Sequence, residues 1–133
     1  MIPVDGFSNK IENFLSFCLE CVDANRRAAI AEMDADNQIQ DILHNIELGE
    51  NYPDDYILQG LALKNIRKDR RMAKDVVRIT HPIVQLVNQN QKTINELEKL
   101  LGAVRKAEKN TVGRMYSNRT KILEGLFEEE GGD

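Results

Sequence analysis

Apolar residues recur through the first third of the chain at the spacing of an α-helix. Between residues 8 and 48 they fall on one stripe when each residue is turned by about 100°. This predicts a helix about 60 Å long. Ser8 is the predicted N-cap and Gly49 the predicted end. The stripe consists of Phe7, Ile11, Phe14, Leu15, Cys18, Cys21, Val22, Ala28, Ala29, Met33, Ile39, Leu43 and Ile46.

A second amphipathic pattern covers residues 54–87 and predicts a second long helix. Pro82 lies inside it and lacks a backbone N–H, so the helix is predicted to kink or split near Thr80. A shorter third helix is predicted over residues 92–110, with an apolar line of Ile94, Leu97, Leu101 and Val104. The apolar face of the second helix contains Leu58, Leu61, Ala62, Ile66, Ala73, Val76, Val77, Ile83, Val84 and Val87.

The two long helices are predicted to fold back on each other, because a long helix with one apolar stripe is not stable alone in water. The turn GENYPDDY lies between them. In an antiparallel hairpin about this turn, facing residues have numbers that sum to about 102. The pairs predicted to lie close are Asn25 and Val77, Glu32 and Arg70, and Asp36 and Ile66.

The predicted fold class is all-α: a long antiparallel helical hairpin with a kinked second helix, a shorter third helix and a flexible acidic C-terminal tail. Residues 1–120 are expected to form a single helical domain, and residues 121–133 an acidic tail that is frayed or disordered. No run approaches the roughly 18 apolar residues of a membrane span. The start, MIPVDGFSNK, lacks the pattern of a leader, and two cysteines suit a reducing compartment, so a cytoplasmic location is expected.

Polar residues interrupt both apolar stripes at points that meet in the hairpin. A buried polar layer is therefore predicted, consisting of Asn25, Glu32, Asp36, Asn65 and Asp69. Such a layer fixes the register of a long helical pair. Other apolar residues lie off the stripes or at their edges and are candidates for a subunit seam, so a homodimer or higher oligomer is expected. They are Leu19, Ile30, Leu63, Met72, Ile79 and Leu86.

Charge is segregated along the chain, although the net charge is only -4. Residues 1–60 carry 3 basic and 12 acidic residues, residues 61–121 carry 15 and 5, and residues 122–133 carry 0 and 5. Much of the basic stretch NIRKDRRMAKDVVRIT is predicted to meet acidic residues of its own chain or of a partner copy. A candidate ligand- or partner-binding face on the solvent side consists of Arg67, Lys68, Arg71, Lys74 and Arg78.

That basic face could bind nucleic acid or a phosphorylated small ligand. The sequence pI of about 5.3 argues against nucleic acid. So does the lack of aromatic residues beside the cations, because single-stranded nucleic acid is held largely by stacking.

The motif CLEC, with Cys18 and Cys21, has the spacing of half a zinc site. His81 faces Cys21 in the hairpin register, whereas His44 lies about 39 Å from Cys18 along a continuous helix. Both cysteines also lie on the apolar stripe, where reduced cysteine packs as a small hydrophobic residue. Core packing is the preferred interpretation, and no metal or cofactor is expected.

Three carboxylates are predicted to converge from the two long helices. Glu32 and Asp36 are one turn apart, and Asp69 lies across from them. Such carboxylates bind metal in some all-α enzymes, which leaves a metal-dependent enzyme as an alternative. The paired Glu-x-x-Glu and Glu-x-x-Asp repeats of those enzymes are missing from these segments. A buried polar layer is therefore preferred, with counter-charge from Arg26, Arg27 or Arg70.

The stretches DILHNIEL (41–48), LKNIRKDRRMAKD (63–75) and INELEKLLGAVRKAEKNTVGRMYSNR (94–119) resemble small helical proteins of phages and prophages of Gram-positive bacteria. The resemblance covers about residues 40–119 and includes the pair Arg114-x-Tyr116. It implies a phage protein expressed in the host cytoplasm. The family has no assigned activity, so it implies no site residues. Such proteins often bind and block a host or defence component.

The expected function is that of a non-catalytic interaction protein, which binds a host or phage protein through helical surfaces. The first alternative is a binder of nucleic acid or of a phosphorylated ligand through the basic face. The second is the metal-dependent enzyme. The salt dependence of binding distinguishes the interaction protein from the binder of nucleic acid or of a phosphorylated ligand, because phosphate contacts weaken steeply between about 50 and about 200 mM salt.

Overall fold

The computed structural model describes residues 5–112, which form three α-helices. These are α1 (Phe7–Leu48), α2 (Pro53–Gln89) and α3 (Gln91–Val112). The described residues contain no β-strand, so the predicted all-α fold class is confirmed. The predicted acidic tail and the pair Arg114-x-Tyr116 lie outside the described residues.

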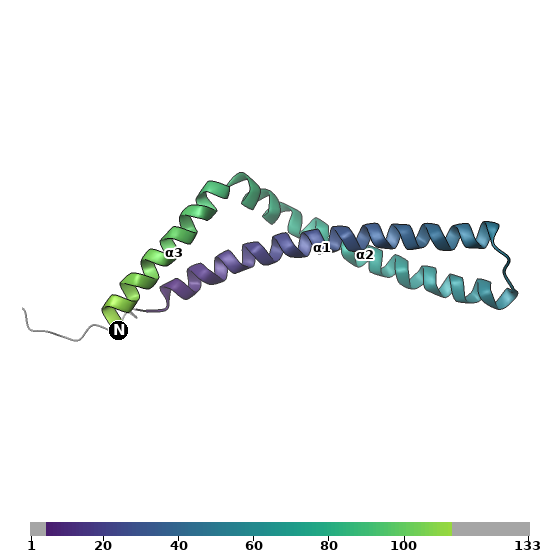
Figure 1. Cartoon of the computed structure of the whole chain (residues 1–133), viewed down its shortest axis with the longest axis horizontal. Coiled ribbons are helices and arrows are strands. Elements are labelled where there is room, and N and C mark those ends of the chain that lie inside the picture. Colours follow the sequence, from purple (N-terminus) through teal and green to yellow (C-terminus); the bar gives the residue numbers. More distant parts are fainter. Residues whose placement is uncertain (1–4, 113–133) are drawn as a thin grey trace, which may run out of the picture.

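Helices α1 and α2 form the predicted antiparallel hairpin and lie side by side over the half of the molecule next to their turn (Figure 1). The Asn25 side-chain amide donates to the Val77 carbonyl at 3.3 Å. The Arg70 guanidinium lies 3.9 Å from the Glu32 carboxylate. The residue numbers of both pairs sum to 102, which confirms the predicted register.

Buried residues, most of them small, recur every seven positions along both long helices. They are Cys21, Ala28 and Ala35 on α1, and Ala73, Thr80 and Val87 on α2. A seven-residue repeat keeps two helices in contact as a coiled coil, and small side chains let their axes approach closely. No side chain in the described part is fully buried. The hairpin is therefore stabilised along a thin seam.

The predicted apolar face of α2 is confirmed in part, because Ala73 and Val87 are buried. The sequence pattern predicts that Leu58, Leu61 and Val76 pack on α1, but all three are exposed. Leu63 was predicted to belong to the subunit seam but is half-buried. It lies seven positions before Arg70, which contacts α1, and therefore on the same side of α2 as Arg70. These predictions are wrong because a straight helical wheel drifts by about 20° per heptad from a coiled-coil contact line.

Side-chain amides hold the turn between α1 and α2. Asn51 Nδ2 donates to the Asn45 carbonyl at 2.8 Å, and Asn51 Oδ1 accepts from Gln59 Nε2 at 2.8 Å. The Asp55 carboxylate accepts a bond from the Tyr52 backbone N–H at 2.8 Å and so caps the start of α2. These bonds fix where α1 ends and α2 begins, and thereby the register of the hairpin.

Helix α2 continues through Pro82 to Gln89, so the predicted split near Thr80 does not occur. The Thr80 hydroxyl donates to the Val76 carbonyl at 2.7 Å, a bond within the helix that often accompanies a bend. The kink at Pro82 stays a prediction.

Helix α3 turns back along the first half of α1, so that its end lies beside the start of α1 (Figure 1). The Glu108 carboxylate accepts a bond from the Ser8 backbone N–H at 2.7 Å and one from the Ser8 hydroxyl at 3.0 Å. Arg105 forms an ion pair with Glu12 at 2.6 Å. The predicted apolar line of α3 is half-buried: Ile94, Leu97, Leu101 and Val104.

The start of α1 also differs from the prediction. Ser8 lies inside the helix, and the N-cap is Gly6, whose φ of 88° is accessible to glycine without a steric penalty. Glu108 satisfies a free N–H of the first turn and places a negative charge near the positive end of the helix. The sequence pattern around Ser8 could not indicate this, because the capping carboxylate is 100 residues away.

Candidate functional site

A polar contact joins the two long helices at Asn25. Asn25 is half-buried, and its Nδ2 donates to the Thr80 hydroxyl at 3.1 Å and to the Val77 carbonyl at 3.3 Å. Thr80 itself is buried, and its hydroxyl donates to the Val76 carbonyl. Both bonds of Asn25 cross from α1 to α2, so they are satisfied in one register only.

Arg70 connects the basic stretch of α2 with the acidic residues of α1. Its guanidinium donates to the Asp36 carboxylate and lies 3.9 Å from the Glu32 carboxylate. Part of the basic stretch thus meets acidic residues of its own chain. Of the predicted buried polar layer, Asn25 and Glu32 are half-buried, whereas Asp36, Asn65 and Asp69 are exposed, so the predicted burial of these three residues is wrong.

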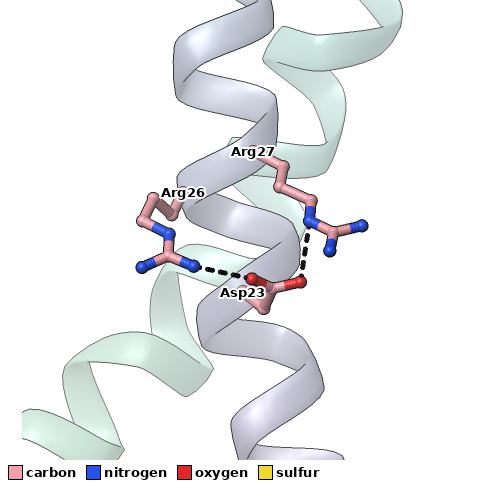
Figure 2. A network of polar contacts seen from close by, with 3 residues as sticks. All are labelled: Asp23, Arg26 and Arg27. Carbon is pink, nitrogen blue, oxygen red and sulfur yellow. Dashed lines mark hydrogen bonds and ion pairs between the residues drawn. The ribbon is translucent and has the colours of Figure 1, made fainter.

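Arg26 and Arg27 do not supply counter-charge to Glu32 or Asp36. Figure 2 shows that both bind Asp23 of the same helix, each at 2.9 Å. Pairs three or four residues apart on an exposed helix contribute only about 0.3–0.5 kcal/mol. This network stabilises α1 locally.

The remaining cations of α2 are exposed, and we call them the basic face. Arg78 pairs with Asp75 at 3.1 Å, whereas the other five have no ion pair among the described residues. A groove of about 640 Å³ opens beside this face and is lined by the cations Arg71, Lys74 and Arg78, and also by the carboxylates of Glu32 and Asp75. The basic face consists of Lys64, Arg67, Lys68, Arg71, Lys74 and Arg78.

A second apolar line runs along α2, and we call it the second seam. Its members are Leu58, Met72, Val76, Ile79 and Leu86. Four of them fall on one seven-residue repeat, in which Asn65 occupies the remaining position. The exposed fractions of these four side chains are 65 % for Leu58, 66 % for Met72, 71 % for Ile79 and 55 % for Leu86.

The second seam has the 4-3 spacing of a coiled-coil contact line. Val76 follows Met72 by four residues, Ile79 follows Val76 by three, and the half-buried Ile83 follows Ile79 by four. Helix α2 therefore carries two such lines, of which only one faces α1. Met72, Ile79 and Leu86 were predicted to lie at a subunit seam, whereas Leu58 and Val76 were predicted to face α1. The seven-residue period would have indicated Leu58 together with Met72, Ile79 and Leu86, and the 4-3 spacing would have added Val76.

Cys18 and Cys21 are buried and carry free thiols. Burial, and secondarily the neighbouring Cys21 thiol, raise the pKa of Cys18 above its ordinary value. The Cys18 thiol is therefore protonated at neutral pH and a poor nucleophile. His81 is exposed. Among the described residues, no three His, Cys, Asp or Glu side chains are grouped so that they could hold a metal ion.

No helix within residues 5–112 combines the length and the apolar character needed to cross a membrane. Comparison of the chain with protein-family models, with curated proteins and with solved structures finds no match. The function must therefore be argued from the surfaces that the helices present.

Proposed function

We propose that this protein is a non-catalytic interaction protein that binds another protein through the second seam of α2. The observation that carries the proposal is the regular exposure of Leu58, Met72, Ile79 and Leu86 on one side of one helix. Single exposed apolar residues are normal on a protein surface, but an aligned series of them is typical of a binding surface.

The spacing of the second seam also indicates the shape of its partner. A line with a 4-3 repeat is complementary to another amphipathic helix, whose side chains fit between its own. Burial of apolar side chains depends little on salt, so binding at this surface should persist when the salt concentration is raised.

Affinity capture with the purified protein as bait tests the proposal. Ile79→Glu places a charge in the middle of the second seam without disturbing the contacts with α1, because Ile79 is exposed. We expect the variant to lose the captured protein, whereas Gln85→Glu, at another exposed position of α2, retains it. Equal capture by the wild type and by Ile79→Glu would show that the second seam is not the binding surface.

The resemblance to phage and prophage proteins adds a biological context to this proposal. A host or phage protein would be the partner, and its inhibition would be the outcome in the host cytoplasm. Capture from infected and from uninfected host cells, followed by mass spectrometry, tests this context. A partner found only among phage proteins would argue against the inhibition of a host component.

The basic face supports a second candidate function, the binding of nucleic acid or of a phosphorylated small ligand. Arg67, Lys68, Arg71 and Lys74 are exposed and have no ion pair within the described residues. Phosphate contacts made by these cations would weaken steeply between about 50 and about 200 mM salt. Titration of labelled single-stranded DNA and of inorganic phosphate at both salt concentrations tests this candidate. The matched variant is Arg71→Gln, and an affinity that salt does not change argues against the basic face.

A further inference from the structure

We infer that the partner of the second seam is a second copy of this chain, with the two α2 helices antiparallel and Ile79 next to the two-fold axis. This inference rests on the proposed function, because it names the partner of the same surface. Three features indicate a second copy as the partner. They are the symmetry of the second seam, the position of its polar residues, and the seven-residue repeat of the contact between α2 and α1.

The first argument is that Met72 and Leu86 are placed symmetrically about Ile79. Met72 and Leu86 are each seven residues from Ile79, and Val76 and Ile83 are three and four residues from it. A two-fold contact requires a patch that is complementary to itself. In an antiparallel pair centred on Ile79, facing residues have numbers that sum to 158, so Ile79 faces Ile79 of the other copy and Met72 of each copy faces Leu86 of the other. These facing pairs are apolar, and Val76 and Ile83 lie one residue out of step with each other.

The second argument is that the polar interruptions of the seam disfavour the other arrangements. A parallel pair would place Asp69 beside Asp69 of the other copy, and like charges side by side are destabilising. An antiparallel pair centred on Met72 would place Asp69 opposite Asp75 of the other copy, which again sets like charges side by side. With the centre at Ile79, Asp69 lies opposite the polar Gln89.

The third argument is that α2 already follows a seven-residue repeat in its contact with α1. A second line with the same repeat keeps a constant offset along the supercoiled helix, so a partner helix that supercoils with it can follow this line. The stretch from Met72 to Leu86 is about 21 Å long.

Thiol cross-linking tests this arrangement on the full chain. Ile79→Cys should form covalent dimers with a short thiol-specific cross-linker, because the two Ile79 positions meet at the axis. Leu58→Cys, which is similarly exposed, should not. Met72→Cys and Leu86→Cys should cross-link when mixed but not separately. The wild type serves as the control, because its two cysteines are buried. Cross-linking of Leu58→Cys together with the other single variants would instead show a parallel pair and overturn the inference.

Sedimentation measurements on the wild type and on Ile79→Glu provide the second test. We expect the wild type to be dimeric and the variant monomeric, with equal helix content by circular dichroism. A monomeric wild type at about 100 µM, well above the dissociation constants of most stable dimers, would overturn the inference. If Ile79→Glu then still abolished capture of a different protein, the proposed function would stand without the dimer. If capture were also absent, both would fail.

Discussion

Asn25 occupies a contact position between α1 and α2 at which an apolar side chain would bury more hydrocarbon. Its amide instead donates to Thr80 and Val77 on the other helix. A polar residue at such a position selects one register at some cost in stability. The specificity of this hairpin therefore depends on a few side-chain atoms, while its apolar contacts alone would tolerate a slip by one turn.

Asn25→Asp removes both donated bonds and places a carboxylate beside the Val77 carbonyl. We expect a loss of about 1–3 kcal/mol in the free energy of unfolding at neutral pH, the usual penalty for an unsatisfied buried polar group. Urea unfolding followed by circular dichroism measures it. The matched control is Asn37→Asp on the exposed side of α1, which should change the value by less than about 0.5 kcal/mol. Equal losses for the two variants would mean that the Asn25 bonds contribute nothing.

The Cys18 thiol is protected because its pKa is raised by burial and by Cys21. The thiolate is the reactive form, so we expect slow alkylation of the folded protein at about pH 8 and fast alkylation in urea, measured by mass spectrometry. The raised pKa contributes stability that is fully present below the unfolded pKa and is lost as pH rises through the folded pKa. Cys18→Ala should therefore lose less stability than the wild type between neutral and alkaline pH. Rapid alkylation of the folded wild type would contradict the burial of this thiol.

At the scale of the helices, the sequence predicted those properties that depend on local patterns. The apolar periodicity gave the three helices, and the turn residues with the polar positions Asn25 and Glu32 gave the register. The capping of α1 by Glu108 was missed, because no local pattern reports a contact across 100 residues. The contact face of α2 was predicted correctly at Ala73 and Val87 but wrongly at Leu58 and Val76, because a straight helical wheel drifts from a coiled-coil contact line.

The close approach of α1 and α2 depends on the alanines at their contact line. Ala28 is buried there, whereas the adjacent Ala29 is exposed. We expect Ala28→Leu to cost about 1–3 kcal/mol in the free energy of unfolding, because the larger side chain forces the helices apart. Ala29→Leu, which adds the same atoms next to it, should have an effect below about 0.5 kcal/mol. Chemical denaturation of both variants is the measurement, and a tolerated Ala28→Leu would show that the helices are not in close contact.

Helix α3 is held against α1 partly by the ion pair of Arg105 with Glu12. We expect Arg105→Glu to cost up to about 1 kcal/mol and to accelerate amide hydrogen exchange in α3, because two carboxylates then face each other. The double variant Glu12→Arg/Arg105→Glu reverses the pair and should restore the protection. Failure of this reversal to restore it would show that the two side chains do not interact, and that α3 depends on its apolar line and on Glu108.

At the scale of the whole molecule, the hairpin places the acidic first helix beside the basic second one. Among the described residues, Arg70 is the one α2 cation that forms ion pairs with α1, and its partners are Glu32 and Asp36. The cations of the basic face remain exposed on one side of α2, and the second seam remains exposed as well. Helix α2 thus presents three surfaces: the line that contacts α1, the basic face and the second seam. Within residues 5–112, only the first of these is covered by another helix of the chain. A molecule this open, with no fully buried side chain in its described part, would gain stability from a partner.

If that partner is a second copy, stability must depend on protein concentration, because association stabilises only the folded chain. Each tenfold increase in concentration favours the dimer by about 1.4 kcal/mol, shared between two chains, which corresponds to a rise of roughly 3 °C in Tm. We therefore expect Tm to increase steadily from about 1 to about 100 µM wild-type protein when measured by circular dichroism. Ile79→Glu should melt at a lower temperature that does not vary with concentration. A constant Tm for the wild type, equal to that of the variant, would mean that the second seam is not covered by its own copy. The stability of the hairpin would then come from the α1–α2 contact alone.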